Sequence, residues 1–321
     1  GTQVGNAVAS FIVESPVYPT MVKKAQQTMK DTAALGGIDW DEEVATLEQL
    51  GGWDETALKS VTGRADWTPD QLPDYFKQKF HAYGNGNLCW EAAKEQMVAG
   101  KAVGVRNFPM YGAGGEDHMR GRFEETIQRM GAFVEEGGTI IDMGCGTGTS
   151  TRRLATAFPD AQEVIGVDLS PYFVAVAQRL AGTQGILSAE EQEACSRVRY
   201  VWADATSSGL PDGSASLVTL SLMIHELPSA ETKKLFQEAH RLLKSGGTLA
   251  VMEMDPESPG FTKLQQNPFL FSLIRSTEPF LGEYFALASS PALTDMLRGA
   301  GFSTVRRMAC TGRHFSLVAF K

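Results

Sequence analysis

The residues with the clearest chemical pattern follow a short apolar run in the middle of the chain. There the sequence reads TIIDMGCGTGTSTRRLA from Thr139, so that Asp142 precedes three glycines at alternate positions, Gly144, Gly146 and Gly148. Glycines adopt backbone conformations that other residues avoid, and they let a ligand lie against the main chain. The turn therefore predicts a ligand site, although many tight strand-to-helix turns contain glycine for structural reasons alone.

Acidic residues at the ends of the next two predicted strands narrow the class of ligand. Asp168 ends the predicted strand within VIGVDLS, twenty residues beyond Gly148, and Asp204 follows RYVWA. A carboxylate at the end of the second strand can accept hydrogen bonds from both ribose hydroxyls of a nucleoside. Asp204 is then placed to meet the exocyclic amine of an adenine ring. A fourth strand ends near Ser221, and the carboxyl ends of parallel strands are where such sheets bind ligands.

The main alternative for the glycine turn is a dinucleotide site. The dinucleotide fingerprint GxGxxG seats a pyrophosphate on the N-terminus of the following helix. Thr149 occupies the position of the third glycine, and the observed pattern is acidic-x-GxGxG. The turn therefore favours a nucleoside ligand without the pyrophosphate of NAD.

The elements that must position these residues alternate between β-branched runs and helical segments. The predicted strands are 139–143, 164–168, 198–202, 217–222, 248–254, 304–309 and 315–320, and the predicted helices are 116–133, 149–158, 171–181, 230–244 and 291–300. This alternation predicts an α/β fold, a doubly wound seven-stranded sheet that is mostly parallel. Only residues 311–314 separate the last two strands, which should form an antiparallel hairpin.

Residues 1–109 are predicted to form a helical N-terminal domain. Its expected helices are 21–34, 41–50, Pro69 to about His81, and Leu88 to about Ala99. Residues 104–115 are rich in glycine and proline, which is typical of a connector between domains. The second domain then spans 110–321 and carries an insertion at 255–290.

Composition limits the function classes. The 321 residues carry a formal net charge of −9, which disfavours a nucleic-acid binder because such proteins need a basic face. The apolar runs are all shorter than the ~18 residues of a membrane span. The four cysteines are far apart and show no metal-ligand spacing, which indicates a reducing compartment and predicts no metal site. The chain begins at Gly1, so we expect that a tag, signal or transit peptide has been removed.

The region 116–321 resembles the class I S-adenosylmethionine-dependent methyltransferases, in particular the small-molecule branch that contains quinone and tocopherol methyltransferases. The resemblance rests on the glycine motif, Asp168 and Asp204, and it implies S-adenosyl-L-methionine as the cofactor. Ser216 departs from the acidic residue frequent in this branch, and 255–290 is longer than in the simplest members. The implied cofactor-binding residues are Asp142, Gly144, Cys145, Gly146, Gly148, Asp168, Leu169, Asp204, Ala205 and Ser221.

Three further stretches, ASFIVESPVY, GNLCWEAAKEQ and RSTEPFLGEY, resemble methyltransferase-like proteins of cyanobacteria and plant plastids. This second resemblance would extend over the whole chain. It implies the plastid stroma as the location, with the cytoplasm as the alternative.

His225, directly after the fourth strand, is the predicted catalytic residue. A histidine with the ordinary pKa of ~6.5 can accept a proton from an acceptor hydroxyl at neutral pH. A structural histidine in a packed turn is the competing interpretation. We also expect the N-terminal helices and the Phe-rich 255–290 insertion to form a largely apolar acceptor pocket above His225.

Two other functions stay open at the level of sequence. One is a catalytically silent scaffold that binds the cofactor and docks to a protein partner through its N-terminal helices. The other is a protein methyltransferase whose N-terminal helices hold a polypeptide. Residues 217–228 lack the D/N-PP-Y/F motif of enzymes that methylate amino groups of nucleic acids.

Overall fold

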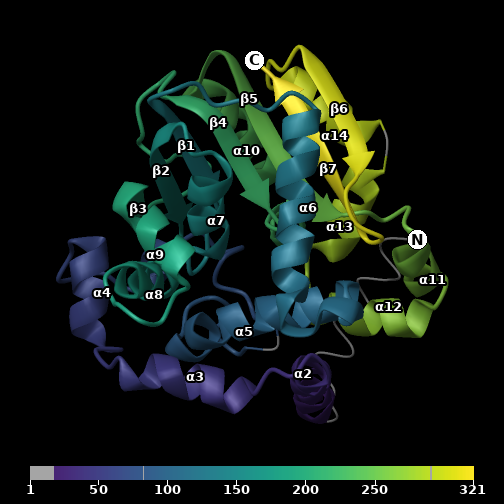
Figure 1. Cartoon of the computed structure of the whole chain (residues 1–321). Helices are drawn as coiled ribbons and strands as arrows, with labels where there is room; N and C mark the ends of the chain where they lie inside the picture. Colours follow the sequence, from purple (N-terminus) through teal and green to yellow (C-terminus); the bar gives the residue numbers. More distant parts are fainter. Residues whose placement is uncertain (1–17, 82, 290) are drawn as a thin grey trace.

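The computed structural model describes residues 18–81, 83–289 and 291–321. Its centre is a seven-stranded sheet in the order β3-β2-β1-β4-β5-β7-β6, in which β7 runs antiparallel to β5 and β6 while the other neighbours pair in parallel. The strands are β1 (Gly138–Met143), β2 (Ala161–Asp168), β3 (Val198–Trp202), β4 (Ala215–Ser221), β5 (Leu243–Met254), β6 (Thr304–Ala309) and β7 (His314–Phe320). The predicted fold class and the final hairpin are confirmed (Figure 1).

Both faces of the sheet are covered, which is why its central strands are apolar almost throughout. Ile141 and Val218 contribute to one buried cluster, whereas their neighbours Ile140 and Leu217 contribute to a second. Successive side chains of a strand point to opposite faces, so the alternation follows directly from the pleat. The covering helices are α6 (Gly115–Arg129), α7 (Thr149–Ala157), α8 (Pro171–Ala181), α9 (Ala189–Ala194), α10 (Ser229–Leu242) and α14 (Ala292–Gly299).

The N-terminal helices lie across the end of the sheet toward which the arrows of β4 and β5 point (Figure 1). They are α2 (Tyr18–Leu35), α3 (Trp40–Gln49), α4 (Glu55–Thr62) and α5 (Trp90–Asn107). Leu47 of α3 and Ala93 of α5 share a buried cluster with Phe173 and Val176 of α8. The N-terminal region is thus packed against the sheet's helical cover at its carboxyl edge.

One predicted N-terminal helix is wrong. From Pro69 only a single turn forms, η1 (Pro69–Gln71), and no helix continues toward His81. The Thr68 side chain makes no capping hydrogen bond, and Pro73 lacks the amide that a continuing helix would need. The unpredicted helix α4 is short, begins at the side-chain cap of Asp54 and ends at Gly63 in the left-handed conformation.

The stretch predicted as a connector, 104–115, is mostly helical. Helix α5 continues to Asn107, and η2 (Pro109–Gly114) leads directly into α6. A β-carbon on Gly104 would overlap the backbone of Gly115 and Glu116. The glycines in this stretch therefore serve the close crossing of two helices, which gives the same local composition as a loop.

The insertion at 255–290 folds into α11 (Pro259–Gln265), α12 (Pro268–Arg275) and α13 (Leu281–Ala288). Phe261 and Phe271 each pack against Phe285, with ring centroids 5.5 and 5.6 Å away. Phe280 immediately precedes α13, whereas the side chain of Phe269 lies outside the described residues. Much of the predicted phenylalanine cluster thus anchors the insertion to the core.

The α5–α6 crossing predicts a stability effect at Gly104. Gly104→Ala should lower the free energy of unfolding by about 1–3 kcal/mol, because the added methyl group overlaps a backbone that cannot move freely. Gly299→Ala in α14 is the matched control, since nothing lies near its added β-carbon. Chemical denaturation of both variants checks this, and equal stabilities would contradict the proposed role of the crossing.

Candidate functional site

A cavity of about 1330 Å³ opens at the carboxyl ends of the strands. Its walls come from the strand-end loops, from α2 and α5, from the 255–290 insertion, and from the turn between β6 and β7. Pockets for one small ligand usually measure about 300–1,000 Å³, so this cavity has room for two ligands together. The N-terminal helices and the insertion both line this cavity, as the predicted pocket requires.

The glycine turn adopts a left-handed conformation that glycine tolerates without strain. Gly144, Gly146 and Gly148 have φ angles of 73°, 55° and 87°, which L side chains avoid. Gly144 and Cys145 line the cavity. Gly146, in contrast, is covered by the side chain of Gln96 from α5, and a β-carbon on Gly148 would overlap the Tyr200 ring.

Gln96 also binds the turn directly. Its Oε1 accepts a hydrogen bond of 2.6 Å from the backbone N–H of Thr147. The Gln96 side chain therefore occupies part of the space above the glycines, where the sequence predicted a bound ligand.

Asp142 is fully buried and does not line the large cavity. Its Oδ2 accepts hydrogen bonds from the hydroxyls of Ser150 and Thr151 at 2.6 and 2.7 Å, and its Oδ1 accepts one from Thr219 at 2.8 Å. Burial raises its pKa, while the three hydroxyls oppose that rise. Asp142 thus joins β1, the start of α7 and β4.

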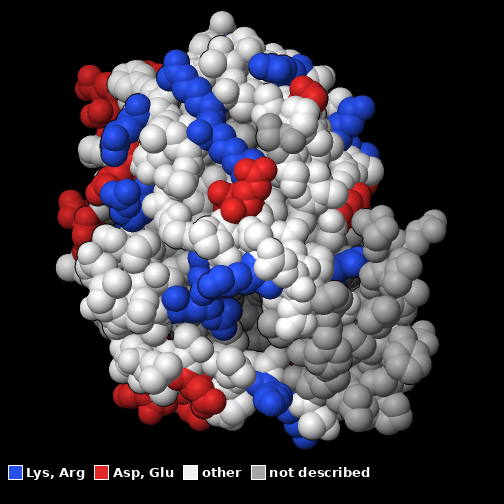
Figure 2. Space-filling view, turned by 90° about the vertical axis from the view of Figure 1, so that its right-hand side faces the viewer, with Lys and Arg blue, Asp and Glu red and all other residues white. Residues whose placement is uncertain are grey.

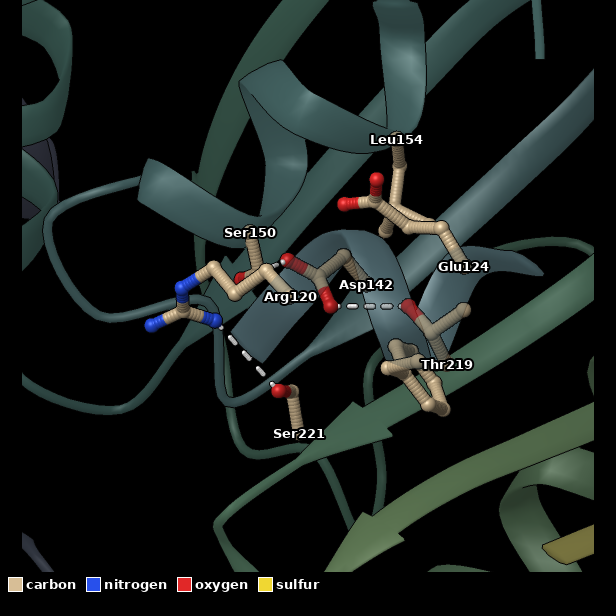
Figure 3. A pocket seen from close by; sticks show the side chains of 8 residues that line it. Arg120, Glu124, Asp142, Ser150, Leu154, Thr219 and Ser221 are labelled. Carbon is tan, nitrogen blue, oxygen red and sulfur yellow. Dashed lines mark hydrogen bonds between the residues drawn. The ribbon is translucent and has the colours of Figure 1, made fainter. Parts of the chain in front are cut away.

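A small side pocket adjoins this carboxylate. Figure 3 shows Arg120 extending from α6 toward Ser221, to whose hydroxyl it donates a hydrogen bond of 3.4 Å. The Arg120 Nε also contacts Glu116 at 2.8 Å. Arg120 and Ser221 line the large cavity as well, so they connect the two spaces.

Asp168 is held by two backbone hydrogen bonds at the cavity wall. Its Oδ2 accepts from the Gly146 N–H and its Oδ1 from the Ser170 N–H, both at 2.8 Å. Each oxygen retains one further acceptor position, and the side chain faces the cavity. Burial raises the pKa of Asp168 to about 6 although both backbone hydrogen bonds lower it, so the group is mostly ionised at neutral pH.

Asp204 lies farther along the same wall. Its Oδ1 accepts from the N–H and the hydroxyl of Thr206, both at 2.8 Å. Leu169 and Ala205 line the cavity beside these two acids. The structure therefore brings Gly144, Cys145, Asp168, Leu169, Asp204, Ala205 and Ser221 to one cavity, and keeps Asp142, Gly146 and Gly148 behind its surface.

His225 is buried in η4 (Ile224–Glu226) and reaches the cavity wall. Its Nδ1 lies 3.0 Å from both carboxylate oxygens of Glu253 at the end of β5, and its backbone N–H donates to Glu253 at 3.2 Å. Burial alone would lower the pKa of His225, but the charge and hydrogen bond of Glu253 raise it to about 9, with further help from Glu226 and Glu278. The ordinary pKa assumed from sequence does not hold here.

Sequence reasoning missed the charged groups around His225. His81 Nε2 lies 3.2 Å from Glu278 and 3.8 Å from Glu226, and Asn87 donates to Glu226 at 3.1 Å. The backbone of His81 has a φ of 49° and donates its N–H to the Thr277 carbonyl at 3.1 Å. Glu226 adjoins His225, but His81, Asn87 and Glu278 come from segments far apart in the sequence, so no local motif could reveal the whole cluster.

Donor atoms of His81, His225 and Glu278 lie within 4.8 Å of one another, a spacing that a metal ion could also use. Each imidazole already contacts a carboxylate directly, His81 that of Glu278 and His225 that of Glu253. We therefore interpret the group as imidazole–carboxylate pairs. The carboxylates make this part of the cavity electronegative, so it favours a proton on the imidazoles.

Comparison with known proteins gives the family. A family model for a methyltransferase domain matches residues 140–247. Demethylmenaquinone methyltransferase of Thermus thermophilus is 32% identical over 178 residues, which cover 51% of this chain and 74% of that protein. The chain belongs to the class I S-adenosylmethionine-dependent methyltransferases. It is an enzyme that uses S-adenosyl-L-methionine to methylate a small-molecule acceptor.

Other relatives agree with this assignment. A ubiquinone/menaquinone biosynthesis C-methyltransferase of Citrifermentans bemidjiense is 24% identical, with 54% of this methyltransferase and 74% of that protein covered. Phosphoethanolamine N-methyltransferase 2 of Haemonchus contortus, solved with S-adenosyl-L-methionine, has a TM-score of 0.50 at 17% identity and covers 79% of this chain and 61% of that one. The structural likeness concerns the fold alone. Among the described helices, none is long and apolar enough to cross a bilayer.

The geometry of Asp168 predicts its effect on cofactor affinity. Asp168→Ala should weaken binding of S-adenosylhomocysteine by about 2–3 kcal/mol, because we expect this carboxylate to accept two charge-assisted hydrogen bonds from the ribose. Glu163→Ala is the control, since Glu163 lies on the same strand and pairs only with Arg199 at the surface. Calorimetry measures both affinities, and an unchanged affinity in Asp168→Ala would exclude this carboxylate as a ribose ligand.

The raised pKa of Asp168 adds a pH dependence. Affinity of the wild-type protein for S-adenosylhomocysteine should fall as pH drops below about 6, because protonation removes the acceptor charge. Asp168→Asn should bind weakly and with little change over the same pH range. A wild-type affinity that stays constant from pH 7 to about 5 would contradict this expectation.

Proposed function

We propose that this methyltransferase modifies an apolar ring acceptor that carries an ionisable hydroxyl, such as a hydroquinone. The observation that carries the proposal is the buried His225–Glu253 pair, which faces the same cavity as Asp168 and Asp204. Quinone methyltransferases among the relatives support this acceptor class. The apolar part of the cavity lining, including Phe261, Leu264 and Ile274, suits a ring or an alkyl chain.

We assign the cofactor-binding roles from the cavity wall. Asp168 would hold the ribose and Asp204 the adenine amine, while Leu169 and Ala205 pack beside the nucleoside. The backbone at Gly144 and Cys145, together with Arg120 and Ser221, lies where the methionine end of the cofactor would fit. We infer that Asp142, Gly146 and Gly148 fix the conformation of the glycine turn without lining the cavity themselves.

When bound, S-adenosyl-L-methionine supplies an electrophilic methyl group that is transferred by in-line displacement. The protein must hold the accepting atom about 3–3.5 Å from the methyl carbon and in line with the breaking bond. The walls from α5 and the insertion provide this orientation and exclude water. The accepting oxygen, or a ring carbon conjugated to it, becomes a better nucleophile once the hydroxyl loses its proton.

His225 is proposed to take that proton. Its neutral form, with Nδ1 held by Glu253, offers Nε2 to the acceptor hydroxyl, and Glu253 then stabilises the imidazolium. A base of pKa about 9 is well matched to a phenol, whose pKa is near 10 by analogy with tyrosine. Near neutral pH most His225 side chains then carry a proton, so we expect the rate to rise with pH.

Two organisational proposals accompany this function. We retain the division into a helical region, 1–109, and a catalytic region, 110–321, with α2 and α5 closing the acceptor site.

All four cysteines are unpaired, which supports a reducing compartment, and the resemblance to plastid proteins makes the stroma our proposed location. The silent-scaffold alternative is not favoured, because the named relatives are methyltransferases.

The function is tested with labelled cofactor and a panel of hydroquinones and phenols, with product detection by mass analysis. Wild-type kcat/KM should rise about tenfold per pH unit and level off near pH 9, because only neutral His225 accepts a proton. Charged and titratable groups facing His225 come from several elements: Glu253, Glu226, Glu278, His81, Tyr284 and His314. A pH-independent rate would contradict the assignment of His225 as the base.

Two variants separate catalysis from binding. His225→Gln should lower kcat by about 10²–10⁴-fold while leaving S-adenosylhomocysteine affinity unchanged. Glu253→Gln should shift the rising limb of the pH profile to lower pH, since the carboxylate is what raises the pKa of His225. A merely structural Glu253 would lower the rate without moving the profile.

A further inference from the structure

Acidic and basic side chains both line the cavity. The acids Asp168, Asp204 and Glu226 lie at or after the ends of strands, Glu91 and Glu95 lie near the start of α5, Glu116 lies in α6 and Glu278 in the insertion. Among the cations that line the cavity, Lys30 pairs with Asp41 at 2.7 Å and Arg120 pairs with Glu116 at 2.8 Å. In the described parts of the chain, four further lining cations have no ion pair with an acidic residue: Lys24, Arg106, Lys263 and Arg313.

Arg106 and Arg313 enter the cavity from different elements. Arg106 lies near the end of α5, and its Nη2 contacts the Met29 sulfur of α2 at 2.9 Å. Arg313 lies in the turn between β6 and β7, with its guanidinium carbon near Gly260 of α11. Figure 2 shows lysine and arginine side chains gathered beside a hollow on one face of the molecule.

The charge of Arg313 acts on Arg106. Burial lowers the pKa of Arg106, and the positive charge of Arg313 lowers it further. Arginine stays charged under all ordinary conditions, so the pair keeps two like charges in a partly desolvated space. A bound anion would remove this repulsion and could accept hydrogen bonds from both groups.

We propose that Arg106 and Arg313 bind an anionic group, a carboxylate or a phosphate, on the methyl acceptor. This inference rests on the proposed function and names a further feature of its substrate. The ionisable ring then lies at the electronegative end, beside His225, while the anionic group lies at the cationic end. Opposite charges at the two ends of one cavity give the acceptor a single orientation, which in-line transfer requires.

The test uses simple probes on protein saturated with S-adenosylhomocysteine. Calorimetry compares benzoate and phenyl phosphate with neutral phenol and benzyl alcohol. At least one anionic probe should bind ten-fold or more tightly than its neutral counterparts, and whichever anion binds better identifies the group. Equal affinity for charged and neutral probes would overturn the proposal.

Variants then assign the preference to the two arginines. The double variant Arg106→Gln, Arg313→Gln should lose the preference for anions, whereas Arg298→Gln, at an exposed site on α14 paired only with Asp295, should keep it. S-adenosylhomocysteine affinity is measured in each variant as a check on folding and on the cofactor site. If cofactor affinity falls instead, the arginines bind the cofactor's own carboxylate and the proposal is wrong. Failure of methyl transfer to any acceptor, with the anion preference intact, would count against the proposed function alone.

Discussion

The buried carboxylate of Asp142 is the interaction on which the rest of the site depends. It joins β1 to the first turn of α7 through Ser150 and Thr151, and to the neighbouring strand β4 through Thr219. A buried carboxylate is costly unless hydrogen bonds satisfy it, so the three hydroxyls must keep their positions. They thereby fix the angle at which the chain leaves the sheet and enters the glycine turn. The positions of the cavity-lining residues Gly144 and Cys145 depend on that angle.

The catalytic sheet alone does not complete the cavity. Gln96 of α5 covers Gly146 and accepts a hydrogen bond from the Thr147 N–H, while the insertion contributes a further part of the wall. The N-terminal helices are therefore part of the same enclosure as the strand ends, and their packing against α8 fixes them there. This arrangement explains how a region without any catalytic motif can still influence the chemistry.

The sequence was most informative where function and fold share a local pattern. Strand periodicity, the glycine turn and the acids at 168 and 204 are all local signals. The sheet order agrees with the predicted strands, and Gly144, Asp168 and Asp204 line the cavity, whereas Gly146 and Gly148 lie behind its surface. Local patterns were misleading at 69–81, where Pro73 prevents a helix, and at 104–115, where helix-crossing glycines resemble a loop. The partners of His225 could not be predicted, because Glu253, Glu278 and His81 meet only through tertiary packing.

The length of helix α5 also has a consequence for the size of the acceptor. It carries Gln96 above the glycine turn and Arg106 near its other end, ten residues and thus about 15 Å apart along a rigid axis. A helix cannot stretch, so this spacing acts as a ruler between the cofactor side and the far wall. Molecules that reach from one end to the other fit its length, and shorter ones leave one end without contacts. Insertion or deletion of residues in α5 would therefore change which lengths of acceptor the cavity selects.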